Sequence, residues 1–285
     1  MARRKSYSEL TFADDFMFCK ILTTRPDLCK ELLELILEIK IKKVEVVGSQ
    51  KEIEPKYDGR GVRLDVYAED DAGTVFDIEM QAAYKRNLPK RMRYYQGMID
   101  MNLIERGDEF DKLKQSYIIF ICTEKPFRDG SNLPVYIFSN ICHQNKEMKL
   151  GDGALKIVVN AEGDRNGLSE ELSSFLDFIQ DKPAQSTFTR EVDRAVKEAI
   201  EHKKWEVEYM TFAMLLKEER AEAKEEGRIE GRVEGRNNVL YELVSDGALP
   251  LDMAVKNYNK TAQEKITAET FKNNMARCGF KLPTE

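Results

Sequence analysis

The chain has 285 residues, a hydrophobic content of 42% and a formal net charge of −6. This length allows one domain with an extension or two small domains, and the apolar fraction is sufficient for a buried core. The acidic balance excludes non-specific coating of nucleic acid, so any such binding must depend on a local basic patch.

The cysteines and histidines restrict the class of protein further. The five cysteines are dispersed, and the chain has two histidines, which argues against a zinc site and favours a reducing compartment. The sequence has no signal-peptide-like start and no apolar stretch near the ~20 residues that a membrane span requires. We therefore expect a soluble, cytoplasmic protein with no membrane partner.

Two helices are predicted near the N-terminus, the first beginning within residues 10–22. The second begins at Pro26, which suits a first-turn position. Its apolar residues recur with helical spacing and form one stripe: Leu28, Leu32, Leu35, Ile36 and Ile39. A strand is predicted at 42–47, followed by a polar, loop-like segment at 48–61.

The stretch RLDVYAEDDAGTVFDIEMQ, residues 63–81, predicts a β-hairpin with two alternating strands. A three-residue loop of Asp71, Ala72 and Gly73 would place Gly73 where such a turn requires a left-handed residue. That register puts Asp65 directly opposite Glu79, with Cβ atoms ~4.5–5.5 Å apart on one face.

The middle of the chain predicts a parallel crossover. A helix from Pro89 to Gly107 separates the hairpin from an almost continuously apolar strand at 116–123. Strand, helix and buried strand in this order are typical of a βαβ unit. Further strands are predicted at 135–140 and 155–160, and a short helix capped near Ser169 at 169–180.

From about residue 183 the sequence becomes charged, helical and sparsely apolar. Glycine recurs every four residues in EEGRIEGRVEGR, at 227, 231 and 235, and each costs a helix ~1 kcal/mol relative to alanine. Either the helix bends here or the glycines allow another helix to approach. We expect residues 190–245 to form an extended helix used for self-association, or a solvated arm without a partner, followed by one or two small helices.

The hairpin could carry metal-dependent chemistry. Mg²⁺ or Mn²⁺ is typically bound through one or two carboxylates together with water and substrate phosphates. Asp65 and Glu79 would supply the carboxylates, the Met80 carbonyl a third oxygen, and Gln81 an amide for the attacking water or a phosphate oxygen. Such a site supports phosphodiester hydrolysis. The alternative is that the polar side chains of the hairpin form the wet side of an antiparallel sheet.

These segments together resemble a known family. The residues Asp65, FDIEMQ at 76–81 and LPKRMRYYQ at 88–96 are similar to the Rpn-type group of the PD-(D/E)XK nuclease superfamily, whose members are labelled recombination-promoting nucleases or transposases. The similarity covers residues 8–180. It extends to the Gly-Arg repeat near the C-terminus in general character and not in detail. We see no transposase-type acidic triad, helix-turn-helix or zinc module.

The resemblance implies an α/β fold with a mixed central sheet flanked by helices and a C-terminal helical extension. It implies that Asp65 and Glu79 bind the metal and that Gln81, where much of the superfamily has lysine, is catalytic. Lys85 or Arg91 could supply the missing charge. An acid of the first helix also joins the site; Asp15 matches best, with Asp14 and Glu9 remaining as alternatives.

A basic segment lies beside the acids and predicts the DNA contact, because clustered cations bind a phosphate backbone. The candidate DNA-binding residues are Lys85, Arg86, Lys90, Arg91, Arg93 and Gln96. We expect a nuclease-like domain at 1–182 and a charged helical region at 183–285 that allows homo-oligomer formation.

Two functions follow from these features. The first is a Mg²⁺- or Mn²⁺-dependent DNA endonuclease with little sequence specificity, linked to recombination or mobile elements. The second is a catalytically weak nuclease fold that serves as a DNA-binding or regulatory module. The absence of a lysine at position 81 favours the second, and metal-dependent nicking of plasmid DNA would separate them.

Overall fold

The computed structural model describes residues 5–53, 61–128, 130, 132–260 and 264–282. The chain divides into two compact units, Met1–Tyr209 and Met210–Glu285, which are described separately below. Among the described residues, none of the helices combines the length and the apolar character needed to cross a membrane.

The first unit is built on a six-stranded sheet of order β1-β2-β3-β4-β6-β5. The strands are β1 (Val44–Ile53), β2 (Val62–Asp70), β3 (Val75–Gln81), β4 (Ser116–Cys122), β5 (Val135–Phe138) and β6 (Ala154–Asn160). The central strands β3, β4 and β6 are parallel, and the pairs β1–β2, β2–β3 and β5–β6 are antiparallel. The sheet is therefore mixed, as predicted.

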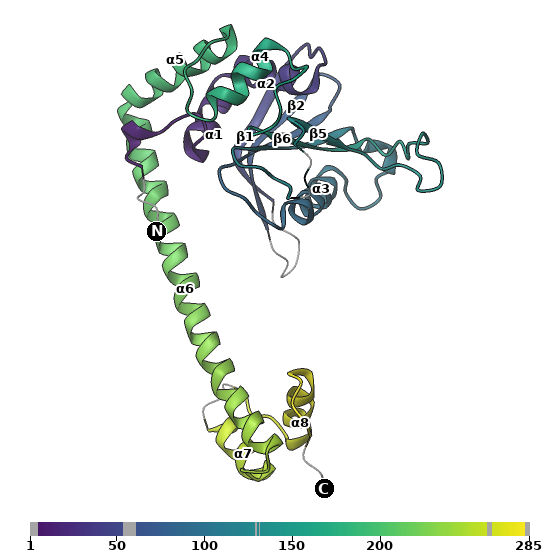
Figure 1. The fold of residues 1–285 in the computed structure, drawn as a ribbon, viewed down its shortest axis with the longest axis vertical. Coiled ribbons are helices and arrows are strands. Elements are labelled where there is room, and N and C mark those ends of the chain that lie inside the picture. The colour runs from purple at the N-terminus through teal and green to yellow at the C-terminus, as the bar shows by residue number, and fades with distance from the viewer. Residues whose placement is uncertain (1–4, 54–60, 129, 131, 261–263, 283–285) are drawn as a thin grey trace. The chain divides into compact units, whose positions relative to one another are not determined.

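Helices cover both faces of this sheet (Figure 1). One face carries α1 (Asp15–Thr24), α2 (Pro26–Leu37), α4 (Glu170–Phe178) and α5 (Thr187–Glu201), and the other carries α3 (Leu88–Leu103). Two short 3-10 helices, η1 (Tyr7–Glu9) and η2 (Phe110–Lys112), lie in the connections. Because both faces are covered, the central strand β4 is apolar along almost its whole length.

The predicted hairpin and crossover are both confirmed. Val66 pairs with Ile78 and Ala68 with Phe76, the register that a loop of residues 71–73 requires. Gly73 has φ 78°, the left-handed conformation that glycine adopts without strain. The chain then passes through α3 to β4, which lies parallel to β3.

Several predicted boundaries were wrong. Residues 48–53, expected in a loop, extend β1 because they pair with β2. The helix expected to run from Pro89 to Gly107 ends at Leu103. Ile39, placed on the apolar stripe of the second helix, is exposed because α2 ends at Leu37 and Glu38 takes a left-handed conformation.

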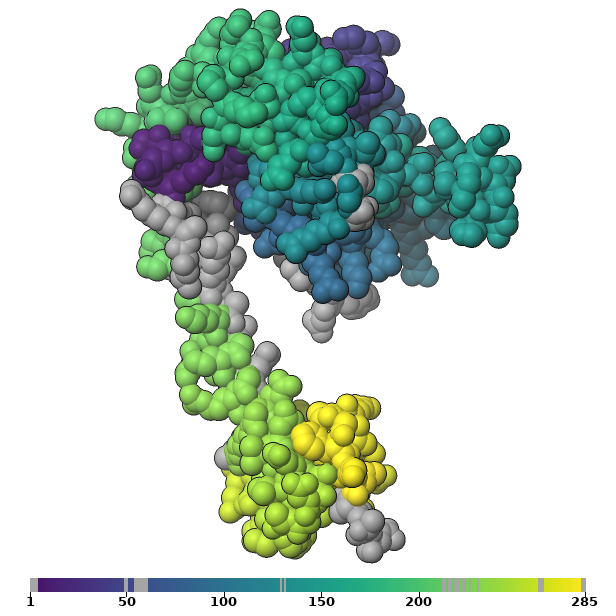
Figure 2. All heavy atoms as spheres, viewed as in Figure 1, coloured from purple at the N-terminus to yellow at the C-terminus, as the bar shows by residue number. Residues whose placement is uncertain are grey.

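The first unit extends well past the boundary predicted at residue 182. Phe188, Val192, Val196 and Ala199 of α5 are buried in the same core as α1, α2 and the sheet. In the space-filling view, α4 and α5 (green) form part of the surface over this face (Figure 2). The compact unit therefore ends at Tyr209.

The second unit contains the C-terminal part of α6 (Lys203–Ser245), together with α7 (Leu251–Asn259) and α8 (Ala268–Arg277). Its small core consists of Leu240, Tyr241, Val244, Ala254, Phe271 and Met275. One or two small helices were expected at the C-terminus, and two are present. The long helix expected at 190–245 is interrupted at His202, which separates α5 from α6.

Two glycines of the first unit should respond oppositely to alanine. A Cβ on Gly163 would lie 2.4 Å from Pro134 Cα, whereas a Cβ on Gly97, within α3, would meet nothing within 4 Å. Gly163→Ala is expected to destabilise the unit by about 1–3 kcal/mol through overpacking. Gly97→Ala should stabilise it by about 0.4–1 kcal/mol by restricting the unfolded chain. Urea unfolding would measure both; equal effects would contradict the close approach at Gly163.

Candidate active site

Two acidic side chains meet where β2 and β3 lie side by side. The pairing of β2 with β3 ends at Val66 and Ile78, and Asp65 and Glu79 are the next residues of the two strands. The Asp65 amide donates a hydrogen bond to Glu79 Oε1 at 2.8 Å. In return, the Met80 amide donates to Asp65 Oδ2 at 3.1 Å. Each carboxylate therefore contacts the backbone of the other strand, and the two share one site.

Both acids have raised pKa values. Burial, followed by the negative charge of Asp15, raises the pKa of Asp65 to about 7. The hydrogen bond from the Met80 amide and the charges of two arginines lower this pKa by a smaller amount. Glu79 is 3% exposed. Its pKa is raised well above the ordinary range by burial and then by the charges of Asp77 and Asp65. Crowded, desolvated carboxylates of this kind are stabilised by a cation.

Asp77 is a third acid at this site, and we did not predict its role. It lies two residues before Glu79 on β3, is fully buried, and neither of its carboxylate oxygens has a hydrogen-bond partner. Burial and then the charge of Asp65 raise its pKa, while contact with the Glu79 carboxyl and the charge of Arg91 counteract this. Burial of Asp77 and Glu79 rules out the alternative that these side chains form a wet face.

Arg91 supplies positive charge from the first turns of α3. Its guanidinium donates to Gln81 Oε1 at 2.6 Å and to Tyr95 Oη at 3.1 Å, and it lies 3.5 Å from Glu79 Oε2. Gln81 in turn donates from Nε2 to the Ala83 carbonyl at 2.8 Å. Gln81 is therefore held in one orientation, and the cation beside the acids comes from Arg91.

The first-helix acids have different surroundings. Asp14 accepts a hydrogen bond from the Thr11 amide and forms an ion pair with Lys5. Glu9 accepts a hydrogen bond from the Ser6 amide. Asp15 is the one whose charge raises the pKa of Asp65. Its own pKa is raised by burial and then by Asp14. Asp15 is thus the acid of α1 that acts electrostatically on the hairpin pair.

Four of the six predicted DNA-binding residues are exposed. Lys85, Arg86, Lys90 and Arg93 are exposed, and Arg91 is half-buried. Gln96 is buried and donates to Ser116 Oγ and Asp100 Oδ1, each at 2.8 Å. The prediction that Gln96 contacts DNA was wrong, because its side chain packs between α3 and the start of β4.

The acids fit Mg²⁺ or Mn²⁺ better than a metal that needs a complete protein cage. Within the described part of the chain, no three or more His, Cys, Asp or Glu side chains are grouped closely enough to hold a metal ion. Mg²⁺ usually keeps several waters and is bound through one or two carboxylates. The Asp65–Glu79 pair, with the unsatisfied carboxyl of Asp77 nearby, matches that requirement.

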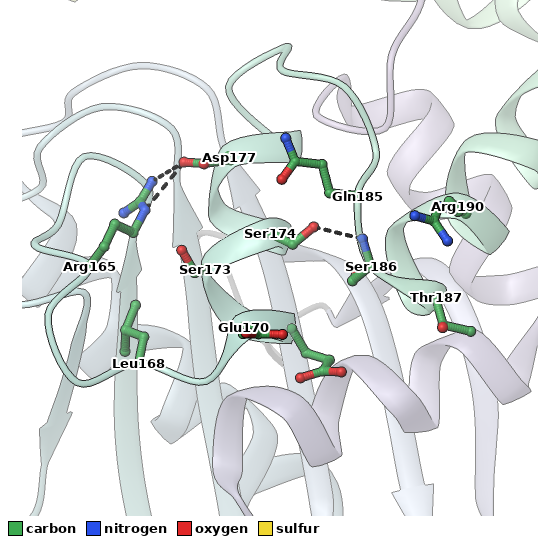
Figure 3. A pocket seen from close by; sticks show the side chains of 11 residues that line it. Arg165, Leu168, Glu170, Ser173, Ser174, Asp177, Gln185, Ser186, Thr187 and Arg190 are labelled. Carbon is green, nitrogen blue, oxygen red and sulfur yellow. Dashed lines mark hydrogen bonds and ion pairs between the residues drawn. The ribbon is translucent and has the colours of Figure 1, made fainter.

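A hollow with a volume of about 560 Å³ lies between α4 and α5 (Figure 3). Arg165 pairs with Asp177 at 2.9 Å, and the Ser186 amide donates to Ser174 Oγ at 3.0 Å. Because these polar groups satisfy one another, the hollow is a polar junction between helices and is separate from the acid pair.

The metal-free chain is expected to lose stability as the pH rises from about 4 to about 7. The pKa of Asp65 is about 7 in the folded chain, compared with an ordinary value of 3.8. The folded state therefore holds a proton that the unfolded state has released, and the free energy of unfolding falls with rising pH in this window. Asp65→Asn should weaken this dependence and raise the melting temperature at pH 7, by about 2–4 °C per kcal/mol.

Thermal unfolding in EDTA between pH 4 and pH 8 would measure this effect. The exposed acid Asp71 on the hairpin loop provides the control, since Asp71→Asn removes the same charge away from the site. An Asp65→Asn variant with the wild-type melting temperature at every pH would contradict the prediction.

A mixed sheet flanked by helices, with acids on an internal hairpin, defines the class of PD-(D/E)XK nuclease folds. The family described as PD-(D/E)XK nuclease family transposase matches residues 13–153, a range that contains Asp15, Asp65, Glu79 and Arg91. Residues 13–153 of the chain are thus similar to this family. Searches of curated proteins and of solved structures found no match.

Proposed function

We propose that the protein is a divalent-metal-dependent DNA endonuclease that hydrolyses phosphodiester bonds. The observation that carries this proposal is the crosswise contact between Asp65 and Glu79, which brings two carboxylates to one point beside an arginine. Similarity to a nuclease family supports the reaction class. The family description is also the basis for a role in recombination or mobile elements.

In this proposal Asp65 and Glu79 bind Mg²⁺ or Mn²⁺, and the charge of Asp15 acts on the pair from α1 without Asp15 being a third ligand. The bound ion would supply Lewis-acid stabilisation of the phosphate and lower the pKa of water. Gln81 orients the attacking water or a phosphate oxygen through its amide. Arg91, held by Gln81 and Tyr95, stabilises negative charge on the scissile phosphate. Lys85, Arg86, Lys90 and Arg93 bind the DNA backbone.

Metal-dependent nicking of supercoiled plasmid by the purified chain tests this function. The active chain should nick DNA with Mg²⁺ or Mn²⁺ and should show no nicking in EDTA. Binding of DNA without nicking under any divalent metal would instead favour the second function, a DNA-binding or regulatory module. The observation that favours this second function is that both ends of the Gln81 amide are engaged within the protein.

We also propose that the chain self-associates through α6 and works in the cytoplasm. Val207, Met210, Met214, Ile229 and Val233 of α6 are more than half exposed, and such a helix gains most of its stability from packing. The free cysteines suit a reducing compartment. Sedimentation should give an oligomer for the full chain and a monomer for a chain ending at Tyr209. Equal monomeric masses would reject self-association through the tail.

A further inference from the structure

The loops that follow β3 and β4 lie side by side at one edge of the sheet. The two strands are parallel and their last residues pair, so both end at this edge. The Thr123 amide donates a hydrogen bond to the Gln81 carbonyl at 3.1 Å. The Tyr84 amide donates to the carboxylate of Glu124 at 2.9 Å. The loop after β4 is therefore held against the end of the strand that carries Glu79 and Gln81.

An arginine and a tyrosine are in contact where these two loops meet. The guanidinium carbon of Arg128 lies over the Tyr84 ring, 4.3 Å from its centre. Tyr84 is half-buried and Arg128 is exposed. A cation over the face of an aromatic ring is attracted by the π-electrons of the ring. The tyrosine thus favours one position of the long arginine side chain.

The contact with the ring leaves the hydrogen-bond donors of Arg128 available. An aromatic ring interacts with a guanidinium through its π-face and does not accept its N–H groups in the way a carboxylate does. Within the residues that the structure describes, the Arg128 side chain has no hydrogen bond and no ion pair. Its planar fork can therefore bind two phosphate oxygens, the geometry that makes arginine a preferred phosphate ligand.

Other charges at this edge are consistent with a phosphate ligand. Lys85 and Arg86 are exposed and follow Tyr84 directly in the chain. Glu124 is an exposed acid of the neighbouring loop, and its carboxylate accepts the Tyr84 amide. Cations from two loops thus lie at the end of the sheet where Arg91 contacts Gln81.

We infer that Arg128, positioned by Tyr84, binds a phosphate of the DNA backbone on the β4 side of the acid pair. The bound DNA then extends across the carboxyl ends of β3 and β4, past the basic segment that the sequence predicted. This inference rests on the proposed endonuclease function. It assigns Arg128 to substrate binding and Tyr84 to positioning, with the chemical step left to the acid pair and Arg91.

The salt dependence of DNA binding tests the phosphate contact without requiring cleavage. The probe is a fluorescein-labelled DNA duplex bound to the full chain in EDTA, followed by anisotropy over a series of salt concentrations. Loss of one phosphate contact lowers the slope of log K against log salt by about 0.9. Arg128→Ala should show this decrease, and Arg128→Lys should keep most of the slope because it retains the charge.

The positioning role of Tyr84 is tested in the same assay. Tyr84→Ala keeps the cation, so it should weaken binding about two- to fivefold with little change in slope. Tyr84→Phe keeps an aromatic ring and should restore most of the affinity. In a chain that already carries Arg128→Ala, Tyr84→Ala should have no further effect, because the tyrosine acts through the arginine.

Arg106→Ala is the matched control, because Arg106 is an exposed arginine that precedes β4, whereas Arg128 follows it. The control should leave the slope unchanged. In plasmid nicking, Arg128→Ala should raise KM about ten- to a hundredfold, as expected for a lost charged hydrogen bond, with little change in kcat. Circular dichroism would establish that the variants are folded.

An Arg128→Ala slope equal to those of the wild type and Arg106→Ala would overturn the inference, as would absence of DNA binding by the wild type. A loss confined to kcat would overturn it as well, since it would place Arg128 in the chemical step. A further loss from Tyr84→Ala in the Arg128→Ala chain would overturn the positioning role. Failure of the wild type to nick plasmid would instead reject the endonuclease function, while the slope would still decide whether Arg128 contacts a phosphate.

Discussion

Replacing Asp65 with alanine is expected to abolish metal-dependent nicking of plasmid DNA, with a loss of about a thousandfold or more. A bound divalent ion contributes several kcal/mol of transition-state stabilisation, and each 1.36 kcal/mol corresponds to about a factor of ten in rate. Asp65 and Glu79 share one site through their crosswise backbone contacts, so Glu79→Gln should cause a similar loss. Neither single carboxylate should retain the ion.

The measurement is the initial rate of conversion of supercoiled to nicked plasmid at several Mg²⁺ and Mn²⁺ concentrations. Asp71→Asn, on the hairpin loop, removes an exposed acid from the same hairpin and should nick at the wild-type rate. Wild type and Asp65→Ala nicking at the same rate would indicate a contaminating nuclease and remove the support for a metal site at this pair.

Replacing Arg91 with alanine is expected to lower kcat by about a hundred- to a thousandfold, as when a preorganised donor to a developing charge is lost. Arg91→Lys should retain part of the activity, because an ammonium keeps the charge but lacks the fork that reaches Gln81 and Tyr95 together. Arg91 is thus the test of whether the guanidinium replaces the lysine that much of the superfamily carries.

The pH profile gives a second readout of the same change. The positive charge of Arg91 lowers the pKa of Asp65 and of Glu79, and both acids must be ionised to bind a metal. Removing the arginine should therefore move the acidic limb of the activity profile to higher pH. Arg93→Ala, an exposed neighbour on α3, should weaken DNA binding and leave that limb in place. An Arg91→Ala variant with wild-type kcat and pH profile would exclude the proposed role.

The parts of the fold that could be predicted are those that short-range chemistry determines. The conformational freedom of Gly73 and the alternation of apolar residues set the hairpin register from Val66 to Glu69. The apolar run of β4 indicated a strand covered on both faces. These features depend on residues close together in the sequence.

The features that were not predicted depend on contacts between segments far apart in the sequence. Residues 48–53 form a strand because β2 pairs with them, and α5 joins the first unit because its apolar face meets a core built from earlier helices. Gln96 was predicted to contact DNA, whereas in the structure its side chain is buried and donates a hydrogen bond to Ser116 Oγ. Asp77 was considered only within the alternative of a wet face, because alternation alone does not reveal what covers a strand.

The crosswise hydrogen bonds at the acid pair have a consequence for how the site is prepared. Each carboxylate accepts a hydrogen bond from a main-chain amide of the adjacent strand, and the second oxygen of Glu79 lies 3.5 Å from the Arg91 guanidinium. The rotamers of both acids are thus fixed when the two strands of the hairpin pair. The polypeptide itself preorganises the site, and an arriving ion need not order two freely rotating side chains.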